Sequence, residues 1–264
     1  MNALLSKAAR DQRRGVIGWS IGAAAVVLLY AAFFPSIAQS AADLRSYIES
    51  LPEAIRNIVA AEDYTTPVGY LESEFFNSMG PLVMSIFAIG AGSRAIAGEE
   101  EAGTLDLLLS APVRRGQVLV TKAIAIVAAT AALGAVAALS IMVFGPIFDL
   151  TVPRSDVAAA CVMLALLGLS FGGIAFAVGA STGRRTMANA VAGGLAVVEF
   201  IVHAIGPTVD WLRPLLPLSP FRWYQEPGVL TGGLRAENVA VLVGIAVVAY
   251  IVARAVFLRR DLSS

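Results

Sequence analysis

Six long apolar stretches most constrain what this chain can fold into. They cover residues 16–34, 75–93, 123–148, 157–183, 186–206 and 238–258. An α-helix needs about 20 mostly apolar residues to cross the hydrocarbon core of a membrane. Backbone polar groups inside lipid must be satisfied within the segment, which a helix achieves. The pattern therefore predicts an all-α, polytopic membrane protein with six transmembrane helices in a single domain over residues 1–264.

Composition narrows the class of protein further. The chain is 58% hydrophobic and only 14% charged, whereas soluble domains carry roughly 25% charged residues. The formal net charge is zero, so no nucleic-acid partner is expected. The single cysteine, Cys161, and the single histidine exclude a Cys/His metal cluster within one chain. We expect no metal site, although carboxylate sites are not excluded by this count.

Charge placement predicts the orientation. Cytoplasmic loops carry an excess of Lys and Arg. Basic residues gather at the N-terminus, between the fourth and fifth stretches and at the C-terminus, whereas residues 35–74 are rich in Asp and Glu. Both termini are therefore expected in the cytoplasm, with the protein in the inner (cytoplasmic) membrane. A cleaved signal peptide is the alternative, but the first apolar stretch exceeds the usual apolar region of about 7–15 residues.

Three segments outside the spans have features of their own. Residues 1–14 predict either an interfacial helix on the cytoplasmic leaflet or a frayed basic tail. Residues 35–74 predict two short extracytoplasmic amphipathic helices, interrupted at Pro52 and followed by a turn at residues 65–67. Residues 207–237 are rich in Pro and aromatics and are predicted to be extracytoplasmic, with a stretch that could re-enter the membrane.

Two glycine pairs predict helix contacts. Gly18 and Gly22 are four residues apart, as are Gly168 and Gly172. This spacing lets helix backbones approach closely in lipid. The alternative is the general glycine richness of membrane helices.

Catalytic motifs are missing from the sequence. It contains no G-x-x-x-x-G-K-[ST], H-E-x-x-H or G-x-S-x-G, so we expect no enzyme in this chain alone. Glu199 and His203 are four apart within a span, where their side chains can meet. They predict either an intramembrane proton or substrate site, or a simple mutual hydrogen bond near the outer interface.

The segment 97–117 reads AGEEEAGTLDLLLSAPVRRGQ and lies between the second and third spans. Its three consecutive carboxylates do not belong in hydrocarbon, which places it at the membrane surface or in water. Its leucine run is too apolar for a solvated linker, so the segment needs a surface to dock against. The alternative for the acidic run is a solvated helix start.

This segment, continued to Ala125, resembles the cytoplasmic segment of ABC-2-type transporter permeases. The resemblance lies in Glu99–Glu101, then Gly-Thr-Leu, the leucine run, Ser110, Pro112-Val113, the arginine pair and a Lys122 that opens the third span. The LSPFRWY and FLRRDL stretches near the C-terminus also resemble this family, and six spans with both termini inside fit it over nearly the whole chain. The first external loop is long and acidic and exceeds that of the shortest family members. The resemblance therefore assigns no particular substrate to this chain.

The resemblance implies a coupling helix that docks in a groove of a separate ATP-binding subunit. Glu99–Glu101 would then lie near the start of this short helix, where negative charge is favoured, or would pair with the partner. Leu105, Leu108 and Leu109 would insert as apolar anchors. The residues implied in the contact are Glu99, Glu100, Glu101, Gly103, Thr104, Leu105, Asp106, Leu108, Leu109, Pro112, Arg114 and Arg115.

The resemblance also implies the cofactors and partners. ATP and magnesium would be bound by the ATP-binding subunit, and none by this chain. A second permease copy or a paralogue would complete a dimer in the lipid membrane. The implied function is that of an exporter permease. The alternatives are a proton-coupled secondary transporter using Glu199 and His203, and an ABC-linked membrane assembly factor.

Overall fold

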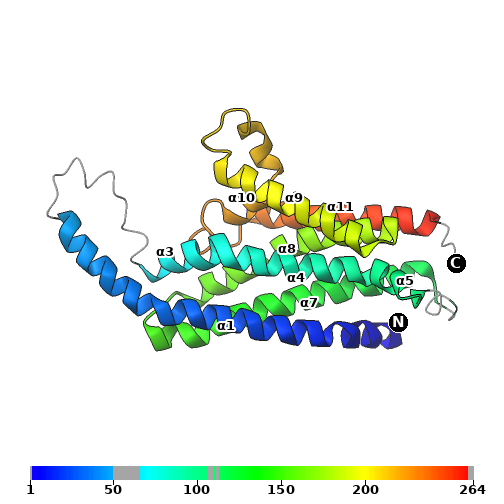
Figure 1. Cartoon of the computed structure of the whole chain (residues 1–264), viewed down its shortest axis with the longest axis horizontal. Coiled ribbons are helices and arrows are strands. Elements are labelled where there is room, and N and C mark those ends of the chain that lie inside the picture. Colours follow the sequence, from blue (N-terminus) through cyan, green and yellow to red (C-terminus); the bar gives the residue numbers. More distant parts are fainter. Residues whose placement is uncertain (1, 50–65, 106–109, 111–112, 261–264) are drawn as a thin grey trace.

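A computed structural model describes residues 2–49, 66–105, 110 and 113–260, and these are helices joined by turns, without a strand among them (Figure 1). Six helical segments in this part of the chain are long and apolar enough to cross a membrane. The predicted all-α fold with six spans is confirmed. The segments are Ser6–Ser40, Pro67–Glu101, Arg115–Phe148, Arg154–Thr182, Arg185–Ile205 and Ala236–Arg259.

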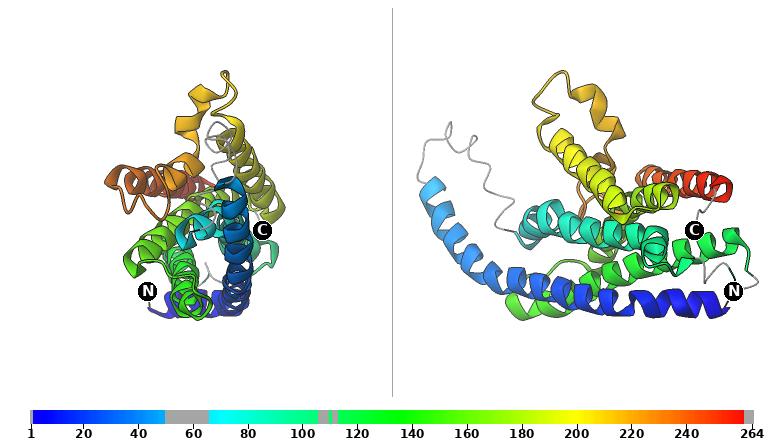
Figure 2. Two further views of the ribbon diagram at one scale, coloured as in Figure 1. Left: turned by 90° about the vertical axis from the view of Figure 1, so that its left-hand side faces the viewer. Right: turned by 45° about the vertical axis from the view of Figure 1, so that its right-hand side comes forward.

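The first of these segments belongs to α1, which runs without interruption over Asn2–Glu49. Figure 2 shows α1 curving away from the bundle towards its C-terminal end. Pro35 lies inside the helix and removes a backbone donor, which is a common cause of such a bend. Residues 2–14 thus continue directly into the first span, and their placement at an interface stays a prediction. The predicted break at Pro52 lies outside the described residues.

The second helical segment is longer than predicted at both ends. It passes through α3 (Pro67–Leu71), η2 (Glu72–Met79), α4 (Gly80–Ser93), η3 (Arg94–Gly98) and α5 (Glu99–Glu101). Thr66 caps its start, where its hydroxyl accepts a hydrogen bond from the Gly69 amide at 3.0 Å. The acidic residues near this start suggested a loop. However, the Glu72 carboxylate accepts a hydrogen bond at 2.8 Å from the Val229 amide, which holds it against the end of the bundle.

Helix α8 (Arg154–Thr182) lies at the centre of the fold. It packs against α4, α7 (Arg115–Phe144), α9 (Arg185–Ile205) and α11 (Ala236–Arg259), while α1 packs mainly along α7. A short η4 (Gly145–Phe148) follows α7. In Figure 1 both termini lie at the same end of the bundle, as an even number of crossings requires.

Close contact between α4 and α8 depends on glycine. A Cβ at Gly172 would lie 2.9 Å from the Ala88 carbonyl oxygen, and one at Gly168 would lie 2.5 Å from Cγ of Met84. The backbones of the two helices therefore lie so close that only glycine fits at these positions, as the Gly168–Gly172 spacing predicts. Gly18 and Gly22 have the same spacing, but a Cβ on either would meet no atom within 4 Å among the described residues. That face of α1 has no neighbour within the described chain.

Two short helices, η5 (Arg213–Leu218) and α10 (Pro220–Gln225), follow α9. The buried Tyr224 hydroxyl donates to the Phe76 carbonyl at 2.9 Å, which attaches α10 to the second segment. Burial raises the pKa of this phenol well above its usual range, so it remains a donor. Whether residues 207–237 lie outside the membrane or re-enter it stays a prediction.

Candidate functional site

The three carboxylates Glu99–Glu101 form α5, the last turn of the second helical segment. We expected them near the start of a separate short helix, and this expectation is wrong. The backbone continues as a helix from α4 through η3 into α5, so the carboxylates lie at a helix C-terminus. Negative charge is unfavourable there, because the helix dipole is negative at that end. The carboxylates therefore need other partners, and each one has a partner within this chain.

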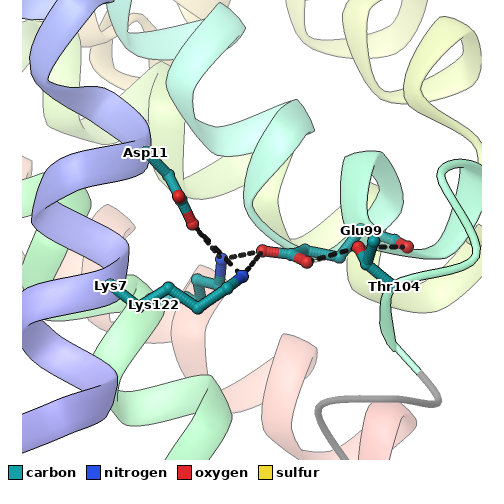
Figure 3. A network of polar contacts seen from close by, with 5 residues as sticks. All are labelled: Lys7, Asp11, Glu99, Thr104 and Lys122. Atoms are coloured by element: carbon teal, nitrogen blue, oxygen red, sulfur yellow. Dashed lines mark hydrogen bonds and ion pairs between the residues drawn. The ribbon is translucent and has the colours of Figure 1, made fainter.

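Glu99 lies between two lysines from different helices (Figure 3). Its Oε1 accepts hydrogen bonds from Nζ of Lys122 on α7 at 2.6 Å and from Nζ of Lys7 on α1 at 2.9 Å. Its Oε2 accepts from the Thr104 hydroxyl at 2.5 Å. Asp11 lies 3.3 Å from the Lys7 Nζ and 4.0 Å from the Lys122 Nζ. The side chains of Glu99 and Lys122 are only 11% and 9% exposed, so this pair is shielded from water.

Glu100 pairs with Arg260, the residue that follows α11. The Arg260 Nη1 donates to Oε2 of Glu100 at 3.0 Å and also to the Ala180 carbonyl at 3.3 Å near the end of α8. Arg115, at the start of α7, donates to the Arg260 carbonyl at 2.9 Å. Glu100 thus joins the second segment to the ends of α11 and α8.

Glu101 joins the second segment to α9. Its Oε1 accepts a hydrogen bond at 2.8 Å from the backbone amide of Arg185, the first residue of α9. The first amides of a helix have no partner within the helix, so this carboxylate satisfies one of them. We call Glu99–Glu101 with these partners the carboxylate cluster. It connects one turn of helix to α1, α7, α9 and the end of α11.

Leu105 is buried inside this chain, with 2% of its surface exposed. It packs in a core cluster with Val118 and Leu119 of α7 and Phe257 of α11. Its side chain fills this chain's own core in the structure, and its role as an anchor in a partner groove stays a prediction. Gly103, two residues before it, has a φ of +66°, a conformation that glycine adopts at low cost.

The rest of the predicted contact set divides into two groups. Arg114 precedes α7, where its backbone amide donates to the side chain of Gln117 at 3.0 Å. Arg115 is engaged with Arg260, as described above. The others, Asp106, Leu108, Leu109 and Pro112, lie outside the described residues.

Glu199 and His203 do not form the hydrogen bond that their spacing allows. Ser219 donates to the backbone carbonyl of Glu199 at 3.2 Å, but no hydrogen bond or ion pair joins the two side chains among the described residues. The polar groups near His203 are instead Gln225, Glu226 and Arg222 around α10. The mutual hydrogen bond is thus not formed, and a proton or substrate site at these two residues stays a prediction.

Sequence reasoning missed the intrachain partners of the carboxylates. Lys7 and Arg260 are separated from Glu99 and Glu100 by 92 and 160 residues. The available signal was topological, because the basic ends of the chain and the acidic run were all predicted on the same side of the membrane. That rule gives the side but does not give the pairs.

A family model described as "ABC-2 family transporter protein" matches residues 2–262. No curated protein matches the chain.

Proposed function

Because this chain belongs to the ABC-2 family of transporter proteins, and so is the membrane-spanning permease component of an ABC transporter, we propose that it exports cargo using ATP hydrolysed by a separate subunit. The sequence has no phosphate-binding G-x-x-x-x-G-K-[ST] loop, which supports a division of labour between two chains. ATP and magnesium would then belong to the ATP-binding subunit. We place the carboxylate cluster and both termini on the cytoplasmic side of the inner membrane.

The carboxylate cluster is the observation that carries this proposal. The 97–117 segment begins at the end of η3 and continues into α5, which is joined by ion pairs and hydrogen bonds to α1, α7, α9 and Arg260 after α11. A partner that displaces the remainder of the segment would therefore act on four spans at once. The cluster transmits the force within this chain, and Asp106, Leu108, Leu109 and Pro112 are left as the expected contacts with the ATP-binding subunit.

Exposed apolar surface supports a second permease copy or paralogue. In the most apolar part of α9 only 17% of the residues are buried, compared with 61% in α8. The exposed side chains of α9 include Val197, Val198 and Ile201. Such a surface in a membrane is covered either by lipid or by a second permease. We therefore include a dimer, formed with a second copy or a paralogue, in the proposal.

Replacing Leu108 and Leu109 together with aspartate is expected to detach the ATP-binding subunit. Removing two apolar anchors from a groove costs about 2–4 kcal/mol, or more than about tenfold in affinity. The measurement is co-purification of the ATP-binding subunit with the tagged permease in mild detergent, together with ATP hydrolysis by the reconstituted pair.

The matched control is Leu234→Asp, which also replaces an exposed leucine with aspartate but lies shortly before the first residue of α11. This variant should retain the ATP-binding subunit. If no ATP-binding protein accompanies the unaltered chain, ATP-driven export is wrong. If the subunit still binds the double variant with unchanged hydrolysis, the docking position is wrong.

Glu199→Gln is expected to leave transport and its pH dependence nearly unchanged. An ATP-driven transporter needs no proton carrier within the span, and the Glu199 side chain has no bond to His203 in the structure. Transport into vesicles, followed across a pH series, tests this. A displaced pH profile would support the proton-coupled alternative.

A further inference from the structure

An open cavity of about 600 Å³ lies beside the carboxylate cluster, between α1 and the second helical segment. The side chains that line it are charged at one end and aromatic further along. Charged side chains of α1, the second segment, α7 and α9 gather at the end nearest α5, while Trp19 and Phe87 line the cavity further from that end. The two rings meet edge to face with their centroids 6.1 Å apart.

The charged end carries more positive than negative groups. Four cationic side chains line it, against two carboxylates. Lys7 and Lys122 are matched by Glu99 and Asp11, as described above. Arg94 and Arg185 are therefore the excess, and neither side chain has a carboxylate within 4 Å in the described part of the chain.

Arg94 shares the cavity wall with another cation. The positive charge of Arg185, which lines the same cavity, acts unfavourably on the Arg94 guanidinium. Its guanidinium folds back along its own helix, so that a Cβ at Gly90 would lie 3.6 Å from Nη2 of Arg94. This direction, towards the helix N-terminus, is the usual one for helical side chains. It takes the charge towards the middle of the bundle.

The cavity also has the length of an amphiphile. Trp19 lies about 18 Å further along α1 than Lys7, at a rise of about 1.5 Å per residue. Tryptophan is favoured at headgroup depth, where one side is apolar and the other is wet. A small inorganic anion would satisfy the two arginines and leave the aromatic part unfilled, whereas a molecule with an anionic head and an apolar chain would satisfy both.

We propose that this cavity binds an anionic phospholipid from the leaflet at this end of the bundle, with its phosphate at Arg94 and Arg185 and its chain against Trp19 and Phe87. Basic pockets between transmembrane helices are known to suit such headgroups. The lipid would bridge α1 and the second segment next to the carboxylate cluster. The proposal goes beyond ATP-driven export and does not depend on it, because it needs only the membrane-embedded chain.

Quenching of Trp19 by brominated lipid tests the proposal. The chain has three tryptophans, so the experiment uses a W211F/W223F background in which Trp19 alone fluoresces. The protein is placed in phosphatidylcholine nanodiscs with increasing fractions of acyl-brominated phosphatidylglycerol or phosphatidylcholine, without an ATP-binding subunit. We expect the anionic lipid to reach half-quenching at about tenfold lower mole fraction.

The R94Q/R185Q variant should lose this preference. R254Q/R259Q is the matched control, because it removes two charges at the same end of the bundle that do not line the cavity. R94K/R185K keeps both charges and should keep the preference, which separates loss of the site from loss of the fold. Each variant is compared by its thermal unfolding midpoint.

Three results would overturn the proposal. Equal quenching by the two lipids would show that no anionic headgroup is selected. Equal loss of preference in R254Q/R259Q would show that general surface charge is responsible. Complete displacement by excess glycerol 3-phosphate would show that a free anion suffices and that the apolar part of the cavity is not used.

Discussion

Gly92→Ala is expected to lower the stability of this protein by about 1–3 kcal/mol or more, for the addition of one methyl group. A Cβ at Gly92 would overlap the carbonyl oxygen of Gly172 and lie 3.0 Å from the amide nitrogen of Phe176. Both are backbone atoms of α8, so no side chain can turn aside to make room. The helices α4 and α8 would have to separate at the centre of the bundle.

Gly22→Ala is the matched control, because a Cβ there meets nothing within 4 Å among the described residues. Alanine is also the better helix former by about 1 kcal/mol, so the unfolding midpoint of this variant should stay level or rise. The measurement is the thermal midpoint of monodisperse protein in detergent by fluorescence-detected size exclusion. Equal losses in the two variants would contradict the close packing of α4 on α8.

The glycines show which parts of this fold can be predicted from the sequence. Length and apolarity predict the six helices, because the bilayer leaves few other structures open to them. Glycine spacing predicts that some helix can approach closely, but Gly18–Gly22 and Gly168–Gly172 look alike in the sequence. Within the described part of the chain, only the second pair packs against another helix. The packing of the whole bundle decides which face of a helix contacts which neighbouring helix. The spacing of residues within one helix does not determine this.

The acidic run shows a different limit. Its location at a membrane surface follows from the cost of burying charge. Its role does not follow, because an acidic triplet before Gly-Thr-Leu fits a helix start as well as a helix end. Helical structure continues through Arg94–Gly98 into the triplet, so the carboxylates close the second segment. Their partners at Lys7 and Arg260 come from the two ends of the chain, beyond the reach of any local pattern.

Glu99→Gln is expected to be the most destabilising change within the carboxylate cluster. It takes away the close carboxylate of the Lys122 ammonium, whose side chain is only 9% exposed, and leaves only Asp11 at 4.0 Å. Lys7 is 41% exposed and can turn to water or to Asp11, so the penalty comes mainly from Lys122. Removing one partner of a buried pair costs about 3–5 kcal/mol, and partial exposure places this pair towards the lower end.

A double-mutant cycle separates this pair from general disruption. Lys122→Met alone leaves Glu99 with Lys7 and Thr104 and should cost less than Glu99→Gln. The Glu99→Gln/Lys122→Met double variant removes both charges and should recover at least about 1 kcal/mol relative to the sum of the single variants. Asp210→Asn, which breaks an exposed pair with Arg213, should change stability by no more than about 1 kcal/mol. Additive losses around the cycle would mean that Lys122 and Glu99 do not depend on each other, and α7 would then be free to move without α5.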